Sequence, residues 1–412
     1  MNTSPHAGFV NGLAAFGGTS QPERPLYVGR PNIPDRETVL ARVGTALDNR
    51  WLSNDGPMVR EFEEVVEAHL GVRHCVAVAN ATQGLGIVAK ALGLHGEVVV
   101  PAFTFVATAH SLAWQGLTPV FCDIDRESHQ LDPAAVEAVI TERTTGILAA
   151  HTWGRPCDID SLTELAARHH LQLFFDAAPA YGASYRGTHI GNFGRAEVLS
   201  FHATKVVNSG EGGAILTNDD EIAATARLMR TFGFADTDLV TSIGTNAKMS
   251  ELAAGMGICS LASYDEYLAV NTRNFDRYRS ALAGVPGISV LPCTPGTAIN
   301  FNNVVIEVDP NRAGIERDIV LQVLTAEQIL VRRYFWPGCH RMEPYRSLRT
   351  PSDDHFPITD LVAGRVLSLP TGTSIGPADI DRVCELIAGI VEHASEISER
   401  ARDRMAGSSG DP

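Results

Sequence analysis

Residues 198–216 read VLSFHATKVVNSGEGGAIL, and this stretch decides the fold. It contains a short apolar run, a loop with one lysine, three glycines and a second apolar run. Between residues 35 and 265, such strand-like runs alternate with helical patterns, which is typical of a mainly parallel sheet covered by helices. We therefore expect an α/β fold, with strands at residues 75–79, 97–100, 118–123, 145–150, 171–176, 198–201 and 213–216.

The length of the chain predicts a second domain, because 412 residues exceed what one hydrophobic core usually supports. Helices are expected at residues 83–92, 132–141, 160–170 and 219–229, and a helical stretch at 249–282 leads into a proline- and glycine-rich loop at 284–296. The last part should contain a strand at 302–308 and helices at 317–327 and 378–400. We assign 1–34 to an N-terminal arm, 35–265 to the large α/β domain, 266–405 to a smaller C-terminal α+β domain and 406–412 to a disordered tail.

The composition excludes several classes of protein. No apolar run reaches the roughly 20 residues of a membrane-spanning helix, and the first residues do not resemble a signal peptide, so a cytoplasmic protein is expected. A net charge of −15 argues against nucleic-acid binding. The seven cysteines are scattered without a CxxC pair, so neither a disulfide framework nor a metal site is indicated.

The chain has three lysines, Lys90, Lys205 and Lys248, and Lys205 is the best candidate for chemistry. A lysine is usually a solvated surface charge. Lys205, however, follows a buried strand and has apolar and glycine-rich neighbours, and a desolvated lysine can lose its proton and attack a carbonyl group. Lys90 is expected on the exposed side of an amphipathic helix, and Lys248 remains open.

Four further residues stand at the ends of predicted strands, and each has two interpretations. Asp176 is either a turn or capping residue or a carboxylate that pairs with a protonated pyridine nitrogen. Thr82 and Ser200 are either ordinary residues at a helix start and a strand end or hydroxyl ligands of a phosphate. An aromatic residue of the run PAFTF at 101–105 either packs in the core or stacks on a flat cofactor ring. The order and spacing of these residues together favour the functional interpretations.

The motifs in this order resemble those of the DegT/DnrJ/EryC1/StrS sugar aminotransferases, which are pyridoxal phosphate enzymes of fold-type I. The resemblance extends from about residue 25 to about residue 396. It is carried by WLSNDGP at 51–57, PAFTFVAT at 101–108, HTWG at 151–154, DAA at 176–178, residues 200–213, GTNAKMSE at 244–251 and LSLP at 367–370.

The resemblance implies a role for each matching residue. Lys205 resembles the lysine that carries pyridoxal 5'-phosphate as a Schiff base, Asp176 the partner of the pyridine nitrogen and Phe105 the stacking aromatic residue. The phosphate ligands would be Thr82, Gln83 and Ser200, together with Asn246 from a neighbouring subunit, which implies a homodimer with shared active sites. One position departs from the family: Pro179 replaces the glutamine that contacts the ring hydroxyl, so this contact is absent or is supplied elsewhere, with His151 and His202 as candidates.

The resemblance also implies a reaction. An amino acid, expected to be L-glutamate, would donate its amino group to a nucleotide-linked keto-6-deoxy sugar, expected to be a dTDP-4-keto-6-deoxyhexose, by a ping-pong mechanism. The residues considered for substrate binding are Arg230, Arg332 and Arg333 for the diphosphate and Ser53, Asn54 and His340 for the sugar. The arginine pair could equally form surface salt bridges, and His340 could pack in a turn. The alternatives are amination of a C3 keto sugar or a keto-inositol, and a non-catalytic binding or regulatory protein with this fold.

Overall fold

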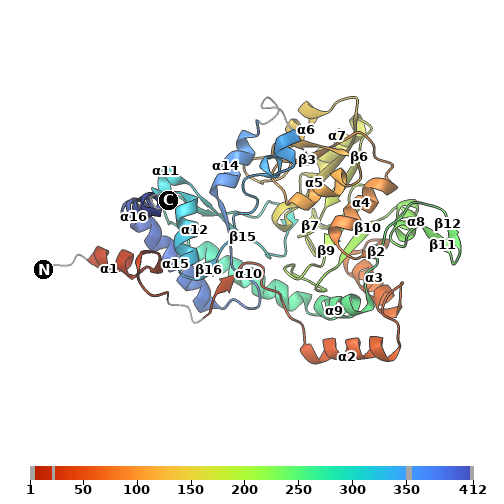
Figure 1. Cartoon of the computed structure of the whole chain (residues 1–412), viewed down its shortest axis with the longest axis horizontal. Coiled ribbons are helices and arrows are strands. Elements are labelled where there is room, and N and C mark those ends of the chain that lie inside the picture. Colours follow the sequence, from red (N-terminus) through yellow and green to blue (C-terminus); the bar gives the residue numbers. More distant parts are fainter. Residues whose placement is uncertain (1–4, 21–23, 349–354, 409–412) are drawn as a thin grey trace.

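A computed structural model describes residues 5–20, 24–348 and 355–408 of the chain. Its centre is a seven-stranded sheet with the strand order β2-β10-β9-β6-β5-β3-β4 (Figure 1). The strands are β2 (His74–Val78), β3 (Glu97–Pro101), β4 (Thr118–Cys122), β5 (Thr144–Ala150), β6 (Gln172–Asp176), β9 (Glu197–Ser200) and β10 (Gly213–Thr217). Strand β10 is antiparallel to both of its neighbours, whereas β9, β6, β5, β3 and β4 are parallel. All seven predicted strands are confirmed.

Helices cover both faces of this sheet, and each face has its own buried cluster. The helices are α3 (Pro57–Leu70), α4 (Ala81–Ala91), α5 (Val106–Ala113), α6 (Pro133–Val139), α7 (Ile159–Arg168), α8 (Asp220–Met229) and α9 (Glu251–Ala262). Phe62 of α3 and Leu162 of α7 pack on one face. Leu85 of α4, Leu112 of α5 and Ile222 of α8 pack on the other. The carboxyl ends of the parallel strands remain open between these layers, where α/β proteins place their ligands.

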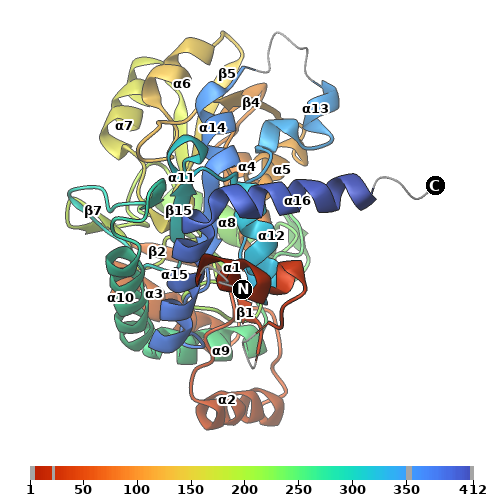
Figure 2. The same ribbon diagram turned by 90° about the vertical axis from the view of Figure 1, so that its left-hand side faces the viewer.

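The smaller part of the chain is built on an antiparallel sheet of β13 (Ile288–Val290), β15 (Val304–Val308) and β17 (Val366–Leu369). Figure 2 shows its helices from their outer side. They are α10 (Tyr264–Ala281), α11 (Pro310–Ala313), α12 (Arg317–Ala326), α14 (Pro357–Arg365), α15 (Pro377–Glu392) and α16 (Ala394–Ser408). Helix α10 joins the two cores, because Tyr267 packs in the large one and Tyr278 in the small one.

Two of the predicted helices are each divided in two. The stretch 249–282 breaks at Ser263, between α9 and α10, and the helix predicted at 378–400 breaks at His393. Helix α16 continues to Ser408, so residues 406–408 are helical, which corrects the predicted start of the disordered tail. Residues 409–412 lie outside the described residues.

The N-terminal arm packs on the small core. It contains α1 (Pro5–Gly12), η1 (Ala14–Phe16) and β1 (Leu26–Tyr27), and β1 pairs in parallel with β16 (Ile329–Leu330). The side chains of Val10, Leu13 and Leu26 are buried in the small core. The chain then continues into α2 (Arg36–Asp48), which lies below the body in Figure 1 and packs on α9. The proposed domain boundaries remain a prediction.

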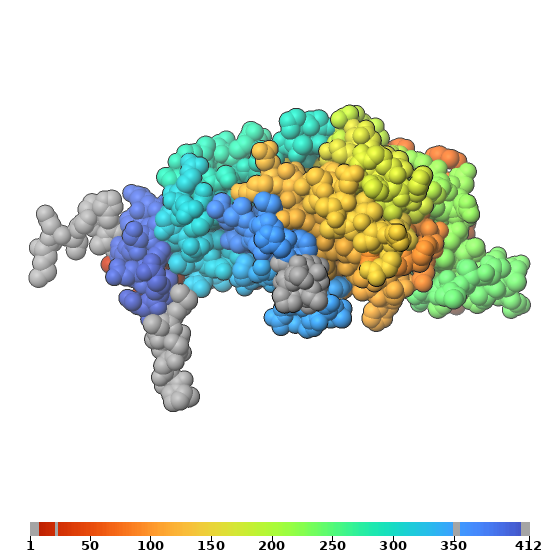
Figure 3. Space-filling view, turned by 90° about the horizontal axis from the view of Figure 1, so that it is seen from above, coloured from red at the N-terminus to blue at the C-terminus, as the bar shows by residue number. Residues whose placement is uncertain are grey.

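The two parts of the molecule meet along an extended contact (Figure 3). The segment with η3 (Cys339–Arg341) and α13 (Tyr345–Leu348) lies within the sequence of the small part but packs on the large one. The Tyr345 hydroxyl lies 2.7 Å from His110 Nδ1, and the Tyr345 ring contacts Phe121 at 5.1 Å. Several two- or three-residue strands lie at the surface: β7 (Ser184–Tyr185), β8 (Thr188–His189), β11 (Phe234–Asp236), β12 (Leu239–Val240) and β14 (Thr297–Ala298). None of the helices in the described ranges is long and apolar enough to cross a membrane.

Candidate active site

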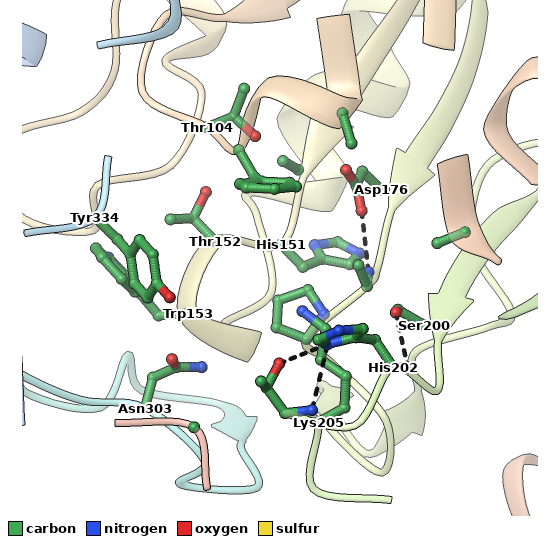
Figure 4. Close-up of a pocket in the computed structure, with 18 of the residues that line it drawn as sticks. Thr104, His151, Thr152, Trp153, Asp176, Ser200, His202, Lys205, Asn303 and Tyr334 are labelled. Atoms are coloured by element: carbon green, nitrogen blue, oxygen red, sulfur yellow. Dashed lines mark hydrogen bonds between the residues drawn. The ribbon is translucent and has the colours of Figure 1, made fainter. Parts of the chain in front are cut away.

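A cavity of about 360 Å³ lies where the carboxyl ends of the central strands meet the small part of the molecule (Figure 4). Loops after β3, β5, β6 and β9 form one side, and the segments 302–303 and 334–335 form the other. The structure brings Lys205, Asp176, Thr82, Ser200, Phe105, His151 and His202 together around this space. Seven of the residues singled out from the sequence therefore share one cavity.

Lys205 is a cation whose ammonium group is not neutralised by a close partner. Its backbone N–H donates to the His202 carbonyl at 2.9 Å, which fixes the loop after β9. Its Nζ makes no hydrogen bond or ion pair to any residue that the structure describes. Burial lowers the pKa of the Lys205 ammonium, and the Asp176 carboxylate opposes part of this shift. A lysine in this state loses its proton more readily than a surface lysine.

Asp176 is held at the end of β6 by donors on both of its oxygens. The Thr108 hydroxyl donates to Oδ2 at 2.7 Å, and the Ala178 N–H donates to Oδ1 at 3.1 Å. Because Thr108 has one hydroxyl proton and gives it to Asp176, the Thr104 hydroxyl, 2.8 Å away, must donate to Thr108. Such donors suit an ionised carboxylate that faces a cationic N–H group. Thr104 and Thr108 belong to the PAFTFVAT motif, but the sequence did not indicate that they orient Asp176.

The start of α4 provides a corner for an anion. The Asn80 side chain caps the helix by accepting the Gln83 N–H at 2.9 Å, and the N–H groups of Ala81 and Thr82 precede the first residue with an intrahelical partner. Gly213 of β10 packs against this turn, where a Cβ atom would lie 2.7 Å from the Ala81 nitrogen. Ser200 lines the same cavity at the end of β9. These groups suit a phosphate.

Aromatic side chains enclose the opposite side of the cavity. Phe105 is 56% exposed although it lines the cavity, so its ring is available to stack on a flat ligand. Phe335 stacks on Trp153 with ring centroids 5.3 Å apart and an interplanar angle of 16°, and Tyr334 packs against Phe335 at 5.5 Å. Residues 302–303 and 334–335 were not predicted to line the site, because nothing in the sequence shows that they lie beside the strand ends.

The two histidines considered for the ring hydroxyl differ in what they can offer. His151 is fully buried, with its Nε2 at 3.2 Å from Glu197 and its Nδ1 accepting the Cys157 N–H. Both ring nitrogens are therefore in use, which corrects the suggestion that His151 replaces the missing glutamine. His202 is half-buried, and its Nδ1 lies 3.0 Å from the Thr204 hydroxyl. His202 remains a candidate for this contact.

Gln83 and Asn246 do not line this cavity. Gln83 lines a second cavity of about 600 Å³, which it shares with Thr82, and its contact with the phosphate remains a prediction. Asn246 lies on an exposed loop, and its Oδ1 accepts a hydrogen bond from Lys248 Nζ at 2.6 Å. Its proposed role in a neighbouring subunit remains a prediction.

Arg230 is a buried structural residue. Its guanidinium donates to Glu63 at 2.6 Å, to Asp55 at 2.6 Å and to the Ala77 carbonyl at 2.8 Å. The charge is thus neutralised away from the cavity, which corrects the prediction that Arg230 binds a diphosphate. Ser53 and Asn54 lie beside Asp55 and, like it, outside the cavity lining.

The remaining substrate candidates lie outside the cavity lining. Arg333 pairs with Asp318 at 3.2 Å and lies over the Trp336 ring, as expected of the surface alternative. Arg332 is exposed, and its side chain makes no ion pair within the described part of the chain. His340 is fully buried against Phe356 and close to Asp360, so it packs in a turn and does not line the sugar pocket.

The groups that line the cavity fit pyridoxal phosphate. Lys205 offers an amine to its aldehyde, Asp176 a carboxylate to its pyridine nitrogen and the start of α4 a set of donors to its phosphate. Phe105 offers a free ring face. Pro179 offers no side-chain donor, so the ring hydroxyl lacks one contact.

Comparison with known proteins agrees with this geometry. The sequence model of the DegT/DnrJ/EryC1/StrS aminotransferase family matches residues 34–388. The chain is 32% identical over 369 residues to the dTDP-4-amino-4,6-dideoxy-D-glucose transaminase of Escherichia coli, covering 89% of this chain and 99% of the relative. It is 36% identical over 341 residues to the GDP-perosamine synthase of Caulobacter vibrioides, covering 82% of this chain and 91% of the relative. The crystal structure of DesI in the presence of its TDP-sugar product superposes with a TM-score of 0.92 at 48% identity, covering 95% of this chain and all of that chain.

Proposed function

This chain belongs to the DegT/DnrJ/EryC1/StrS family and is a pyridoxal phosphate-dependent sugar aminotransferase, and we propose that it transfers the amino group of L-glutamate to a dTDP-4-keto-6-deoxyhexose. The observation that carries the site assignment is the Lys205 amine, which has no close partner among the described residues and lies in the cavity that also holds Asp176. The α/β fold-type I architecture and the family predicted from the sequence are confirmed.

The names of the relatives support the acceptor. The E. coli relative is a dTDP-4-amino-4,6-dideoxy-D-glucose transaminase, and DesI was crystallised with a TDP-sugar. Both names point to a thymidine diphosphate carrier, and the E. coli name points to the C4 position. The GDP-linked relative is similar over less of the chain. We therefore favour a dTDP-linked 4-keto sugar over a C3 keto sugar or a keto-inositol.

Each residue of the cavity has a defined task in this proposal. Bound pyridoxal phosphate supplies an electrophilic carbonyl carbon and a ring that delocalises the electron pair left on a deprotonated carbon. Lys205 Nζ, whose pKa is lowered by burial, would take the proton from the α-carbon of the amino acid and pass it to the former carbonyl carbon of the cofactor. In the second half of the cycle it would move a proton from that carbon to the keto carbon of the sugar. Asp176, oriented by Thr108, holds a proton on the pyridine nitrogen. The start of α4 and Ser200 bind the phosphate. Because both substrates use the same cavity, they bind in turn, and ping-pong kinetics are expected.

The diphosphate of the acceptor needs a cation near the cavity mouth. Arg230 and Arg333 form ion pairs with Glu63 and Asp318. Arg332 forms no ion pair with a carboxylate in the described part of the chain. It stands two residues before Tyr334, which lines the cavity. We assign the diphosphate contact to Arg332.

We also propose that two copies form a homodimer in which Asn246 reaches the partner's phosphate. Large apolar side chains are exposed around this loop: Ile243 is 94% exposed and Trp114 is 90% exposed. The hairpin β11–β12 projects from the body at the right of Figure 1 and exposes Leu239 and Val240. Apolar exposure of this extent is typical of an interface. A molar mass in solution of twice the chain mass would support the proposal, and a monomer that is fully active would contradict it.

The acceptor is tested with a panel of keto sugars. The purified protein is converted to its pyridoxamine phosphate form and incubated separately with dTDP-4-keto-6-deoxyglucose, dTDP-3-keto-6-deoxyglucose, the GDP analogue and a keto-inositol. Mass and proton spectra identify the aminated product. The proposal expects rapid amination of the dTDP-4-keto sugar, and preferential amination of any other member of the panel would contradict it.

A further inference from the structure

The small part of the molecule presents to the cavity two polar side chains that have no hydrogen-bond partner among the residues that the structure describes. Asn303 and Tyr334 both line the cavity. Neither the Asn303 amide nor the Tyr334 hydroxyl makes a hydrogen bond to a described residue. In Figure 4 both side chains point into the space opposite Lys205 and His202.

The neighbouring asparagines have hydrogen-bond partners for their side-chain amides, whereas Asn303 has none among the described residues. The Asn300 amide donates to the carbonyls of Pro179 and Tyr181 at 2.8 and 3.0 Å, and the Asn302 amide donates to the Thr204 carbonyl at 3.1 Å. Two of the three asparagines in this segment thus attach it to the loops that carry the catalytic groups. The third, Asn303, directly precedes β15 and is left with its donor and acceptor facing the cavity.

Tyr334 is also fixed in position. Its ring packs against Phe335 at 5.5 Å, and Phe335 in turn stacks on Trp153 and contacts Phe103. A hydroxyl held in this way loses little conformational entropy when it binds a ligand. Thr152, which lines the same cavity, is likewise held by Gln130 through both its backbone N–H and its carbonyl group.

The chemistry of these groups selects a class of ligand. A carboxylate or a phosphate is best bound by arginine, lysine or clustered N–H donors. Asn303, Tyr334 and Thr152 are neutral, and each can donate and accept a hydrogen bond, which matches the hydroxyl groups of a sugar ring. The aromatic ring of Phe335, which lines the same cavity, suits the apolar face of such a ring.

We infer that Asn303 and Tyr334 form the subsite that recognises the hydroxyl groups of the acceptor sugar and so determine which hexose is aminated. This inference rests on the proposed function. It places the sugar between the small part of the molecule and Lys205, and it separates recognition of the sugar from recognition of the nucleotide.

The test compares the binding of two ligands to the full-length protein in its pyridoxamine phosphate form, in which the aminated product does not react. Calorimetry gives the Kd of dTDP-4-amino-4,6-dideoxy-D-glucose and of dTDP alone for the wild type, Asn303→Ala and Tyr334→Phe. The controls are Asn311→Ala on α11 and Tyr185→Phe on β7, which both lie outside the cavity lining. We expect each cavity variant to raise the Kd of the sugar nucleotide roughly three- to tenfold, as for one lost neutral hydrogen bond, and to leave the Kd of dTDP unchanged.

Two outcomes would overturn the inference. Either the cavity variants bind the sugar nucleotide as tightly as the controls do, or they weaken dTDP and the sugar nucleotide by the same factor. Amination of the keto-sugar panel by the wild type reports separately on the proposed function. A wild type that aminates the dTDP-4-keto sugar while the variants bind it normally would remove the inference and leave the function intact.

Discussion

At the scale of single residues, the site depends on the Lys205 amine, which is buried without a close counterion among the described residues. Lys205 and Asp176 could be predicted because Asp176 ends a short buried strand and Lys205 stands in the loop after another, where α/β proteins concentrate their chemistry. Thr108, 68 residues before Asp176, could not, because its contact exists only once α5 packs beside β6. Arg230 was assigned wrongly because its charge is visible in the sequence, whereas Glu63 and Asp55, which neutralise it, are not adjacent to it.

The lowered pKa of Lys205 gives a prediction for the cofactor-free protein. Because the Asp176 carboxylate favours the ammonium form, Asp176→Asn should lower the pKa of Lys205 further. The acylation rate of Lys205 by a small neutral reagent, followed by peptide mass spectrometry, should then rise at a lower pH than in the wild type. The exposed Lys90 serves as the internal reference, and Asp238→Asn in the surface hairpin as the control variant. A profile that stays in place or moves to higher pH would contradict the electrostatic account.

At the scale of elements, burial decided which parts of the fold were predictable. The central strands are continuous apolar runs because both of their faces are covered. The strands β7, β8 and β14 have two residues each and no periodicity to detect. The breaks at Ser263 and His393 interrupt helical patterns without a glycine or proline at the break, so the sequence shows one long helix where the structure has two.

One helix contact across the fold is open to test. The start of α3 has no side-chain cap of its own, and Glu251 of α9 accepts the N–H groups of Met58 and Val59 at 2.8 and 3.1 Å. Glu251→Gln replaces one of these acceptors with a donor, so we expect a loss of about 1–3 kcal/mol in the free energy of unfolding. Urea unfolding of the cofactor-free protein measures it. Glu64→Gln, on the exposed side of α3, should change stability by less than about 0.5 kcal/mol. Equal stability of the two variants would show that Glu251 is not the cap.

At the scale of the whole molecule, the cavity exists because two cores are held against each other. The sequence indicated two domains, but not that the N-terminal arm packs on the small core or that residues 339–348 pack on the large one. These contacts join segments that are hundreds of residues apart and have no local signature. One of the links between the cores is ionic: Glu307 of β15 binds Arg126 and His129 of the loop after β4.

This link predicts how stability depends on pH. Burial raises the pKa of Glu307, but the hydrogen bonds from His129 and Arg126 outweigh it and lower the pKa to about 2, from an ordinary value of 4.5. A lowered folded-state pKa stabilises the protein above pH 4.5, and this contribution disappears as the pH falls towards 2. Glu307→Gln should therefore lower the free energy of unfolding by at most about 3 kcal/mol at neutral pH. The variant should also lose less stability than the wild type between these two pH values. Denaturant unfolding across this range, with Glu399→Gln as a surface control, measures the effect. If Glu307→Gln lost as much stability on acidification as the wild type does, the ionic link would not account for the pH dependence.

The most direct test of the central claim is to locate the cofactor on the chain. The protein is purified with pyridoxal phosphate and reduced with borohydride, which fixes the cofactor covalently to the lysine that carries it, and the peptides are then mapped by mass spectrometry. With three lysines in the whole sequence, the result is unambiguous. The account predicts the label on Lys205. A label on Lys90 or Lys248, or no label at all, would contradict it.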